Sequence, residues 1–440
     1  MSVIVVSTTN ALSDLNRANA ENRRSASYQA AEAGVADYLA KLTEDHAYYL
    51  HTVHPAESTR RNSTSTLYAA GQTWDGSSTW TYPTAVNAWR TLPNGYEYNL
   101  EVTGPTATKP VVTVISTGRK QNAKKEDRRV EVEVRPSSIA DFMMIANRDV
   151  SYGSSATTYG KIYAGIDEVG TAHSVDHAGN AYADVYAENQ VTSLTVGRLF
   201  NGARAIDSDS TPLIRSVIKS PINFSAFTGS LVDVRAAAGL AAGILLDDAS
   251  VEAWQLTFNA DATVTIDKCI TGGQDPAGMS TKPTCNAFQT KPMPTNGAIY
   301  VGQTAIVRGV VDGQVTVVSN NNIVVGENIT YELPGNDVLG LIAKNETIMA
   351  YWSTPSLTIY AAMIAQGGQY RSWTGTLTKA GTYTHVGSVA TNKGGYMSMF
   401  ATRVYQYDTN LQFLQPPYYP VLGEAYSIQS YREVTPPVIP

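Results

Sequence analysis

Apolar residues recur with helical spacing near the start of the chain. From about residue 9 to residue 50, one row of apolar side chains follows the spacing of a helix face, whereas residues 10–24 are mostly polar. The row consists of Tyr28, Ala31, Val35, Tyr38 and Leu42, with alanines in the rows beside it. This pattern predicts a long N-terminal helix with an exposed first half and a packed second half.

Strict alternation of apolar and charged residues follows further along. Residues 129–135 read Arg-Val-Glu-Val-Glu-Val-Arg, and residues 96–102 and 111–116 alternate in the same way. A period of two places valines on one face of a strand and charges on the other. Because a helix precedes these strands, we expect an α+β unit with an antiparallel sheet.

Short apolar triplets then recur at nearly constant steps. Ile162-Tyr163-Ala164 returns as Val185-Tyr186-Ala187, and residues 299–302 return as 323–326. A third set comprises residues 342–343, 364–365 and 389–390. Rungs of this length bury their apolar face only by stacking, so the repeats predict a β-solenoid with an asparagine ladder at residues 320–322. Coincidence of short triplets in a β-rich chain is the alternative interpretation.

These patterns predict a fold class of α+β, mainly β. It comprises a long N-terminal helix with an antiparallel sheet, and a β-solenoid with a small inserted sub-domain that contains a helix. The expected domains are a helical stem (1–50), a sheet (51–140), a first solenoid part (141–225), a sub-domain with a helix, strands and a cysteine loop (226–297), a second solenoid part (298–415) and a proline-rich extended tail (416–440).

Composition narrows the class of protein. The 440 residues include 32 basic and 38 acidic side chains, a net charge of −6 that removes any global electrostatic case for nucleic-acid binding. Charged residues make up 16% of the chain, against about 25% in an average soluble domain. Ser, Thr, Asn, Gly and Tyr replace them, which is typical of a secreted β-rich protein. No stretch approaches the ~20 apolar residues of a membrane span.

The two cysteines, Cys269 and Cys285, flank a polar stretch with Gly and Pro. Two ligands cannot close a zinc site, so we expect no metal there. A disulfide that closes this loop would stabilise the fold by roughly 3 kcal/mol. Two free thiols are the alternative.

One run of basic residues is the strongest local charge feature. It either contacts phosphates at a hairpin tip or forms an ordinary solvated turn, and four acidic residues within it favour the turn. The candidate nucleic-acid contacts are Arg119, Lys120, Lys124, Lys125, Arg128 and Arg129.

Enzymatic motifs are absent: the chain has no nucleophile elbow, phosphate-binding loop or zinc-protease helix. Asp207 with Asp209, and Asp247 with Asp248, would be the acids of a solenoid polysaccharide enzyme. Adjacent acids in a strand point to opposite faces, so turn and cap roles explain these residues better. We therefore expect no catalysis and no cofactor, and keep a polysaccharide-active enzyme as the alternative.

The stem then carries a family resemblance. Residues 6–10 lead into Tyr28-Gln29-Ala30-Ala31-Glu32-Ala33-Gly34-Val35, a segment that resembles the stem of minor pilin-like proteins of type IV pilus assembly. Residues 111–134 resemble the sheet that follows in that family. Residues 321–343 and 405–420 resemble the β-solenoid-type companion domain often found in such chains.

This resemblance implies a non-enzymatic component of a type IV pilus or related filament, at the cell surface and anchored in the inner membrane before assembly. Other pilins are the expected partners, and a surface glycan or DNA is an expected ligand through adhesion or DNA uptake. The filament-packing residues would be Tyr28, Ala30, Ala31, Ala33, Val35 and Tyr38. The family also implies an apolar segment upstream of Val3, so we expect the chain to be a truncated ectodomain.

Overall fold

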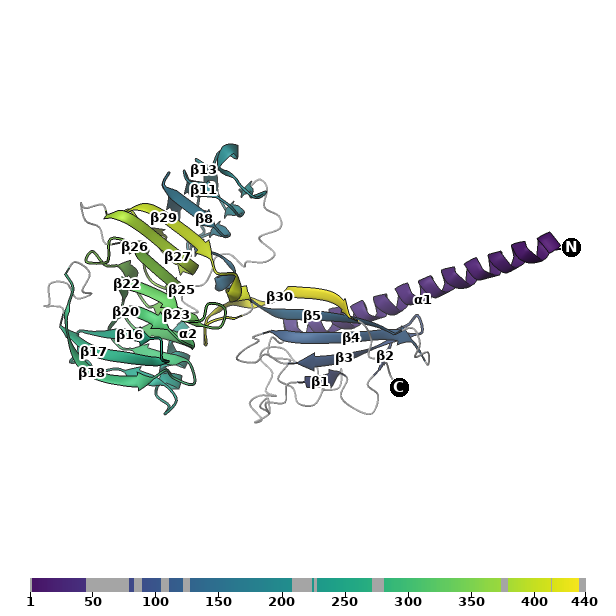
Figure 1. Cartoon of the computed structure of the whole chain (residues 1–440), viewed down its shortest axis with the longest axis horizontal. Helices are drawn as coiled ribbons and strands as arrows, with labels where there is room; N and C mark the ends of the chain where they lie inside the picture. Colours follow the sequence, from purple (N-terminus) through teal and green to yellow (C-terminus); the bar gives the residue numbers. More distant parts are fainter. Residues whose placement is uncertain are drawn as a thin grey trace. The chain divides into compact units, whose positions relative to one another are not determined.

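The computed structural model describes residues 2–44, 79–82, 89–103, 111–121, 127–207, 224, 228–270, 281–372, 379–412 and 414–434. The chain divides into two compact units, which are described one at a time (Figure 1). The first contains Met1–Ser137 and Gly423–Pro440, and the second contains Ser138–Leu422.

The first unit combines one helix with a mainly antiparallel sheet. The sheet has the order β1-β3-β4-β5-β30, with β2 beside β3. Its elements are α1 (Ser2–Glu44), β1 (Thr79–Tyr82), β2 (Arg90–Thr91), β3 (Tyr96–Thr103), β4 (Val112–Lys120), β5 (Arg128–Ser138) and β30 (Val421–Val434). Strand β30 lies in the segment expected as an extended tail.

Period-two alternation decides which face of this sheet is buried. Val130, Val132 and Val134 of β5 are fully buried, and they share a core with Leu100 of β3 and the helix residue Leu42. A strand places alternate side chains on opposite faces, so the charged residues of β5 lie on the other face of the sheet. The valine pattern of residues 129–135 therefore identifies the side on which α1 packs.

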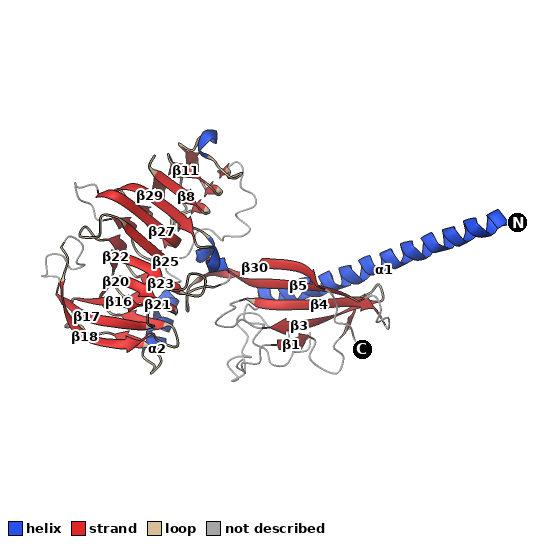
Figure 2. Ribbon diagram, in the orientation of Figure 1, coloured by secondary structure: helices blue, strands red, loops and turns tan. Residues whose placement is uncertain are grey.

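The expected α+β class is wrong. Only α1 and α2 are α-helices among the described residues, and strands form most of the second unit and a sheet in the first, so the chain is mainly β (Figure 2). The long stem expected from the sequence contributes to the core only in part: α1 runs from Ser2 to Glu44, but its described side chains that contribute to the core lie within residues 21–42. The physical reason is that the apolar row begins only at Tyr28, so the more polar residues before it offer the sheet no apolar face.

The second unit is built almost wholly from strands. They are β6 (Met144–Ala146), β7 (Val150–Tyr152), β8 (Ala156–Tyr159), β9 (Ile162–Ala164), β10 (Val175–His177), β11 (Asn180–Ala181), β12 (Val185–Ala187), β13 (Val191–Thr192), β14 (Ala205–Ile206), β15 (Ile244–Leu246), β16 (Ala253–Asn259), β17 (Thr263–Ile270), β18 (Thr284–Pro292), β19 (Ala298–Val301), β20 (Thr304–Val311), β21 (Gln314–Ser319), β22 (Ile323–Tyr331), β23 (Val338–Ala343), β24 (Thr347–Met349), β25 (Leu357–Ala365), β26 (Tyr370–Ser372), β27 (Lys379–Thr391), β28 (Gly395–Tyr396) and β29 (Phe400–Tyr407). The second helix, α2 (Thr228–Ala238), also belongs here.

Most of these strands stack in parallel columns, one strand from each rung. The longest column has the order β15-β19-β21-β23-β25-β27-β6-β9-β12-β14. Its strands are buried on both faces: the inner residues form the solenoid core, and the outer ones pack beneath α2 and neighbouring segments. Parallel strands that are covered on both faces have continuous apolar sequences, which explains the short apolar triplets that recur in this sequence.

The stacking order departs from the chain order at one place. Strand β27 pairs in parallel with β6, and β29 pairs in parallel with β8. The last rungs of the second solenoid part therefore lie against the first rungs of the first part. The two expected parts form one continuous stack.

The register tests each repeat separately. Ile162 lies opposite Val185, and Ile342 lies opposite Ile364, as the repeats predict. The last step of the third set is wrong by one residue, because Val389 lies opposite Met363 and not Ile364. Residues 299–302 and 323–326 are not stacked, because Ile323 lies opposite Ala305 and Thr347 in a different column. The asparagine ladder is present at the bend after β21: the Asn345 side-chain amide donates to Asn321 Oδ1 at 2.8 Å.

An antiparallel meander extends one end of the stack. Strands β16, β17 and β18 pair in sequence, and β16 also pairs in parallel with β20. The disulfide between Cys269 and Cys285 joins β17 to β18. Helix α2 packs on β19 nearby, so the segment expected as a sub-domain contributes directly to the solenoid wall.

Among the residues that the structure describes, no helix contains a window of 18 residues apolar enough to cross a membrane.

Candidate functional site

The apolar row of α1, proposed from the sequence to pack against other subunits, lies against this chain's own sheet. Ala30, Ala31, Val35 and Tyr38 are each 5% exposed or less, and Tyr28 and Ala33 are half-buried. The helix approaches β4 closely, because a Cβ on Gly118 would lie 2.2 Å from the Ser27 carbonyl oxygen. These residues stabilise the unit and leave little surface for a partner.

A buried polar junction fixes the rotation of α1 on the sheet. Asp37 Oδ2 accepts hydrogen bonds from Lys41 at 2.6 Å, Arg90 at 3.0 Å and the Tyr98 hydroxyl at 2.9 Å. Lys41 is 2% exposed, so its charge requires the carboxylate that it contacts. One aspartate on the helix therefore binds both β2 and β3.

A second contact ties α1 to the last strand. The Tyr431 hydroxyl on β30 donates to Glu32 at 2.9 Å and lies 3.3 Å from the Tyr28 hydroxyl. Desolvation, followed by these hydrogen bonds, raises the pKa of Tyr431, so the hydroxyl remains protonated. The N-terminal helix and strand β30, which lie near opposite ends of the sequence, thus pack together in the first unit.

The outward side of α1 is different in character. Residues 21–25 are all exposed, and further along Gln29, Ala36 and Ala40 are exposed while Ala33 is half-buried. A helix turns once in 3.6 residues, so these five consecutive exposed residues place exposed side chains on every side of the helix at that level. Beyond residue 25, the sheet covers only one face of α1.

The basic run does not form a free phosphate-binding surface in the described residues. Arg119 pairs with Glu97 at 2.7 Å and stacks over Trp89 at 3.5 Å, and Arg129 pairs with Glu101 at 2.8 Å. Arg128 pairs with Glu433 at 3.1 Å on β30. Lys120 is exposed, whereas Lys124 and Lys125 lie outside the described residues. Cross-strand ion pairs thus occupy the three described arginines of this run.

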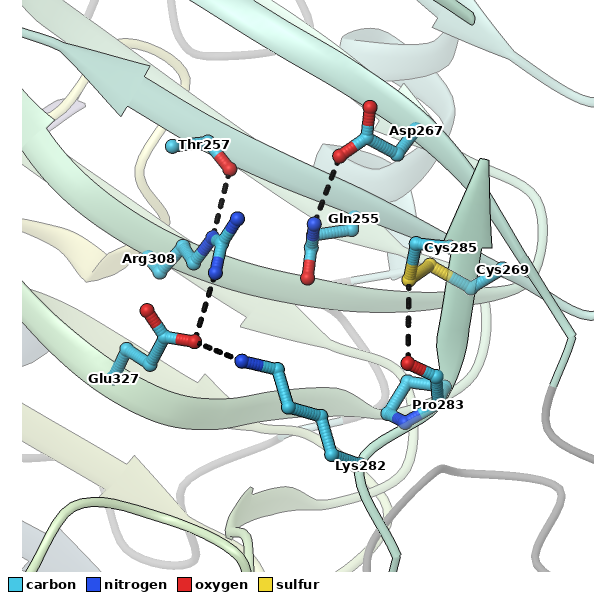
Figure 3. The surroundings of a disulfide bond; sticks show 9 residues. All are labelled: Gln255, Thr257, Asp267, Cys269, Lys282, Pro283, Cys285, Arg308 and Glu327. Atoms are coloured by element: carbon cyan, nitrogen blue, oxygen red, sulfur yellow. Dashed lines mark hydrogen bonds and ion pairs between the residues drawn. A yellow bond between two sulfur atoms is a disulfide. The ribbon is translucent and has the colours of Figure 1, made fainter. Parts of the chain in front are cut away.

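The disulfide joins the end of β17 to the start of β18, beside the described residues 281–283 (Figure 3). Cys269 is buried with Ile306, Val324 and Ala350, and Cys285 packs against the same cluster. Nearby, Lys282 pairs with Glu327 at 2.7 Å, and Arg308 donates to the same carboxylate at 2.8 Å. The covalent bond therefore keeps Lys282 beside its acidic partner.

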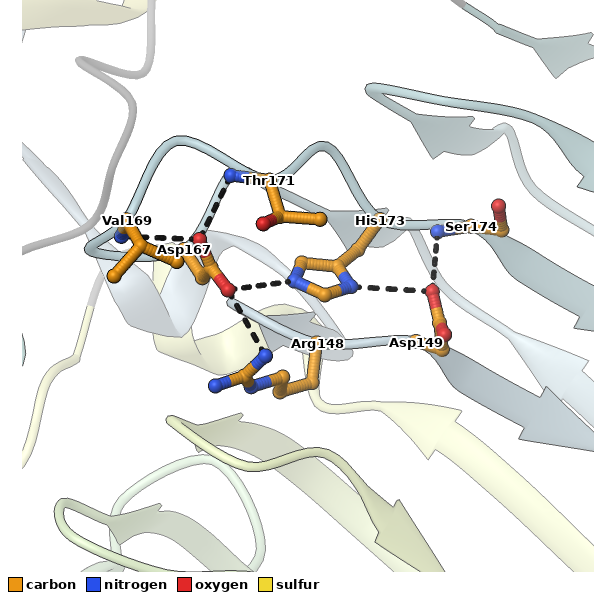
Figure 4. A network of polar contacts seen from close by, with 7 residues as sticks. All are labelled: Arg148, Asp149, Asp167, Val169, Thr171, His173 and Ser174. Atoms are coloured by element: carbon orange, nitrogen blue, oxygen red, sulfur yellow. Dashed lines mark hydrogen bonds and ion pairs between the residues drawn. The ribbon is translucent and has the colours of Figure 1, made fainter.

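A histidine network that the sequence did not reveal lies at one bend of the solenoid (Figure 4). His173 Nδ1 lies 3.2 Å from Asp149 Oδ1, and His173 Nε2 lies 3.3 Å from Asp167 Oδ2. Asp167 also accepts the Thr171 amide, whose hydrogen bond is the largest cause that lowers the pKa of this carboxyl, and it pairs with Arg148 at 2.9 Å.

This network has the geometry of a structural clasp. The two carboxylates flank opposite nitrogens of the His173 ring, so they cannot converge with it on one ion. No group of three or more His, Cys, Asp or Glu side chains in the described parts of the chain is placed to hold a metal ion.

Of the candidate acids that the structure describes, Asp247 and Asp248 each contact neighbouring side chains. Asp247 binds Arg235, and Asp248 accepts from Ser250 and pairs with Lys268. Hydrogen bonds from Ser250, and then Lys268, lower the pKa of Asp248 to about 2. Asp207 is half-buried, and Asp209 lies outside the described residues. Asp247 and Asp248 thus have structural roles.

Comparison with solved structures gives a structural likeness. The chain is similar to the crystal structure of the competence-associated pilin ComZ from Thermus thermophilus, at 13% identity, with 94% of this chain and 97% of that chain covered and a TM-score of 0.32. No family model matches the chain, and no curated protein matches it.

Proposed function

We propose that this chain is a non-enzymatic, pilin-like component of a type IV pilus or related filament at the cell surface, in which the solenoid is the displayed part. The observation that carries the proposal is the environment of α1. One face of the helix is sealed by its own sheet, whereas residues 21–25 are exposed all around the helix. Figure 1 shows α1 continuing past the sheet of the first unit toward the N-terminus.

This environment suits helix-to-helix assembly with other pilins. The outward face carries Ala36 and Ala40 one turn apart, with half-buried Ala33 beside them. Small side chains let two helix backbones approach closely, which increases van der Waals contact between subunits. The docking face is therefore the side opposite to the buried row Ala30, Ala31 and Val35.

The proposal is tested by incorporation into filaments. Cells that make the filament would produce the chain with Ala36→Arg and Ala40→Arg together, and sheared filaments would be probed with an antibody. We expect normal amounts of folded protein in the cells and loss of the chain from filaments, because both sites are exposed. Val196→Arg, at an 87% exposed position of the solenoid, is the matched control and should leave incorporation unchanged.

Incorporation of the double variant at the level of the unmodified chain would refute docking through this face. Substitution at Ala30, one of the filament-packing residues that the resemblance implies, does not test docking. An arginine there would enter the core of the first unit and would prevent folding before assembly.

No observation in the described residues favours the polysaccharide-active enzyme, since Asp247 and Asp248 are held by neighbouring residues.

A further inference from the structure

Three aromatic rings stack on successive rungs at one bend of the solenoid. The ring centroids of Tyr159 and Tyr182 are 4.5 Å apart, and those of Tyr182 and Phe200 are 4.7 Å apart, with interplanar angles of 25° and 15°. Tyr159 is 42% exposed and Phe200 is 37% exposed. These residues form an aromatic ladder on the surface, beside the continuous core.

A row of charged residues runs beside the aromatic ladder. Ile162, Val185 and Ala205 lie opposite one another in neighbouring strands, so the preceding residues Lys161, Asp184 and Arg204 are also aligned. Arg204 donates to Asp184 Oδ2 at 2.8 Å, and its side chain is 70% exposed. Lys161 is exposed as well. The row therefore places exposed basic side chains on both sides of a carboxylate, which is 18% exposed and also accepts from the Tyr186 hydroxyl and the Arg204 amide.

The ladder ends at Phe200. Stacked rings cover one another's faces, so only the two end rings, Tyr159 and Phe200, each have one face that no other ring of the ladder covers. Tyr182 covers one face of Phe200, and no further ring stacks on Phe200 among the described residues. The Ala203 amide donates to the Phe200 carbonyl oxygen at 3.0 Å, and Arg204 follows this turn directly in the sequence.

We propose that Phe200, Arg204 and Asp184 form a carbohydrate-binding site, in which a sugar ring stacks on the free face of Phe200 and continues the aromatic ladder. The axial C–H groups of a pyranose supply the apolar surface that an aromatic face packs against. This inference goes beyond the proposed role in a filament and does not depend on it.

The row contains basic side chains and a carboxylate, and this combination favours binding of a sugar over binding of nucleic acid. A sugar hydroxyl both donates and accepts hydrogen bonds, so it matches an arginine with a carboxylate beside it. A phosphate only accepts, and the carboxylate of Asp184 within the row repels it. Single-stranded nucleic acid would also stack on an aromatic ring, but such sites line the backbone path with positive charge alone.

The site is tested by affinity electrophoresis of the full chain. Native gels would contain dextran, galactomannan, glycol chitin or alginate, and a fluorescent thymidine oligonucleotide would be tested for co-migration in a gel without polysaccharide. We expect at least one polysaccharide to retard the chain. Phe200→Leu, which keeps apolar bulk but removes the flat face, should weaken retardation about three- to tenfold. Arg204→Ala should weaken it about tenfold, since a charged hydrogen-bond donor is lost.

Phe288→Ala is the matched control, because Phe288 is another exposed aromatic residue, on β18, and is 49% exposed. It should leave retardation unchanged, and thermal unfolding should show that all the variants remain folded. Three outcomes would overturn the proposal: no retardation by any of the four polysaccharides, unchanged retardation of Phe200→Leu and Arg204→Ala, or co-migration with the oligonucleotide in place of retardation by polysaccharide.

Discussion

Val389 on β27 lies directly opposite Met144 on β6 in a parallel strand pair. Both side chains are buried in the solenoid core, at 1% and 3% exposure. Through this pair, a rung from late in the chain supports the first rung of the solenoid. The stack is therefore continuous in space although the chain enters it in the middle.

Replacement of Val389 by alanine should destabilise both strands that this contact joins, β27 and β6. The lost methyl groups leave a cavity, and such changes cost about 1–3 kcal/mol in a core. We expect faster amide hydrogen exchange in β6 and β9 as well as in β27. Val264→Ala, a similar change on β17, should affect β16 to β18 and leave β6 unchanged. Equal protection of β6 in the Val389 variant would contradict the continuous stack.

Substitution of Gly118 by alanine should destabilise the first unit. The added Cβ would lie 2.2 Å from the Ser27 carbonyl oxygen and 2.4 Å from the Ala31 amide nitrogen, so helix and strand must separate. We expect a loss of about 1–3 kcal/mol in the free energy of unfolding, measured in urea. Gly197→Ala is the control, because nothing lies within 4 Å of its added Cβ. Equal stability of the two variants would show that α1 does not pack this closely.

Replacement of both cysteines by serine should weaken the meander that carries the disulfide. The bond closes a loop across 16 positions, and its loss should cost roughly 3 kcal/mol by the chain-entropy model. Proteolysis should then cut the segment between Cys269 and Cys285 faster, because nothing covalent holds Lys282 beside Glu327. Lys282→Ala should have a much smaller effect, since an exposed ion pair contributes little. The same cleavage rate in the serine variant would contradict this role.

Acidification should destabilise the solenoid between about pH 6.5 and pH 4. Burial lowers the pKa of His177 to about 4 and that of His385 to about 4, so both side chains are neutral in the fold. The unfolded chain binds protons at these groups below pH 6.5, so stability falls as pH decreases through this window. Thermal unfolding at several pH values measures the effect.

His385→Gln should reduce this pH dependence. Neutral His385 donates from Nε2 to the Ala361 carbonyl oxygen at 3.0 Å, and a glutamine amide is able to supply a similar donor without titrating. His177 retains its own contribution, so the slope of stability against pH should fall without disappearing. Asp248 titrates at about 2, below this window, and does not account for the effect. An unchanged slope in the glutamine variant would exclude His385 as a source.

The sequence repeats predicted strand pairing correctly only where the repeated segments stack in the same column. Ile162 and Val185 were matched correctly, because both fill the same buried position in neighbouring rungs. Ile299 and Ile323 look equally alike, but they belong to different columns. Since every column has buried apolar positions, similarity of short triplets does not reveal which column a strand joins.

The candidate sites depended still more on partners distant in the sequence. Arg119 and Arg129 read as part of a basic hairpin, but Glu97 and Glu101 of β3 pair with them. The aromatic ladder escaped notice because Tyr159, Tyr182 and Phe200 share no local motif. The repeat of residues 162 and 185 offered a signal, since the same step joins Tyr159 to Tyr182.

Local periodicity in the sequence determined which residues are buried: the helical row from Tyr28 to Leu42, and the valines of β5. It did so because each side chain's direction follows from the repeat of its own element. Only the tertiary structure decided that the sheet covers this helical row, that β27 stacks on β6, and which arginines are paired. These outcomes depend on contacts between distant segments, and local periodicity does not specify the partner of a buried face.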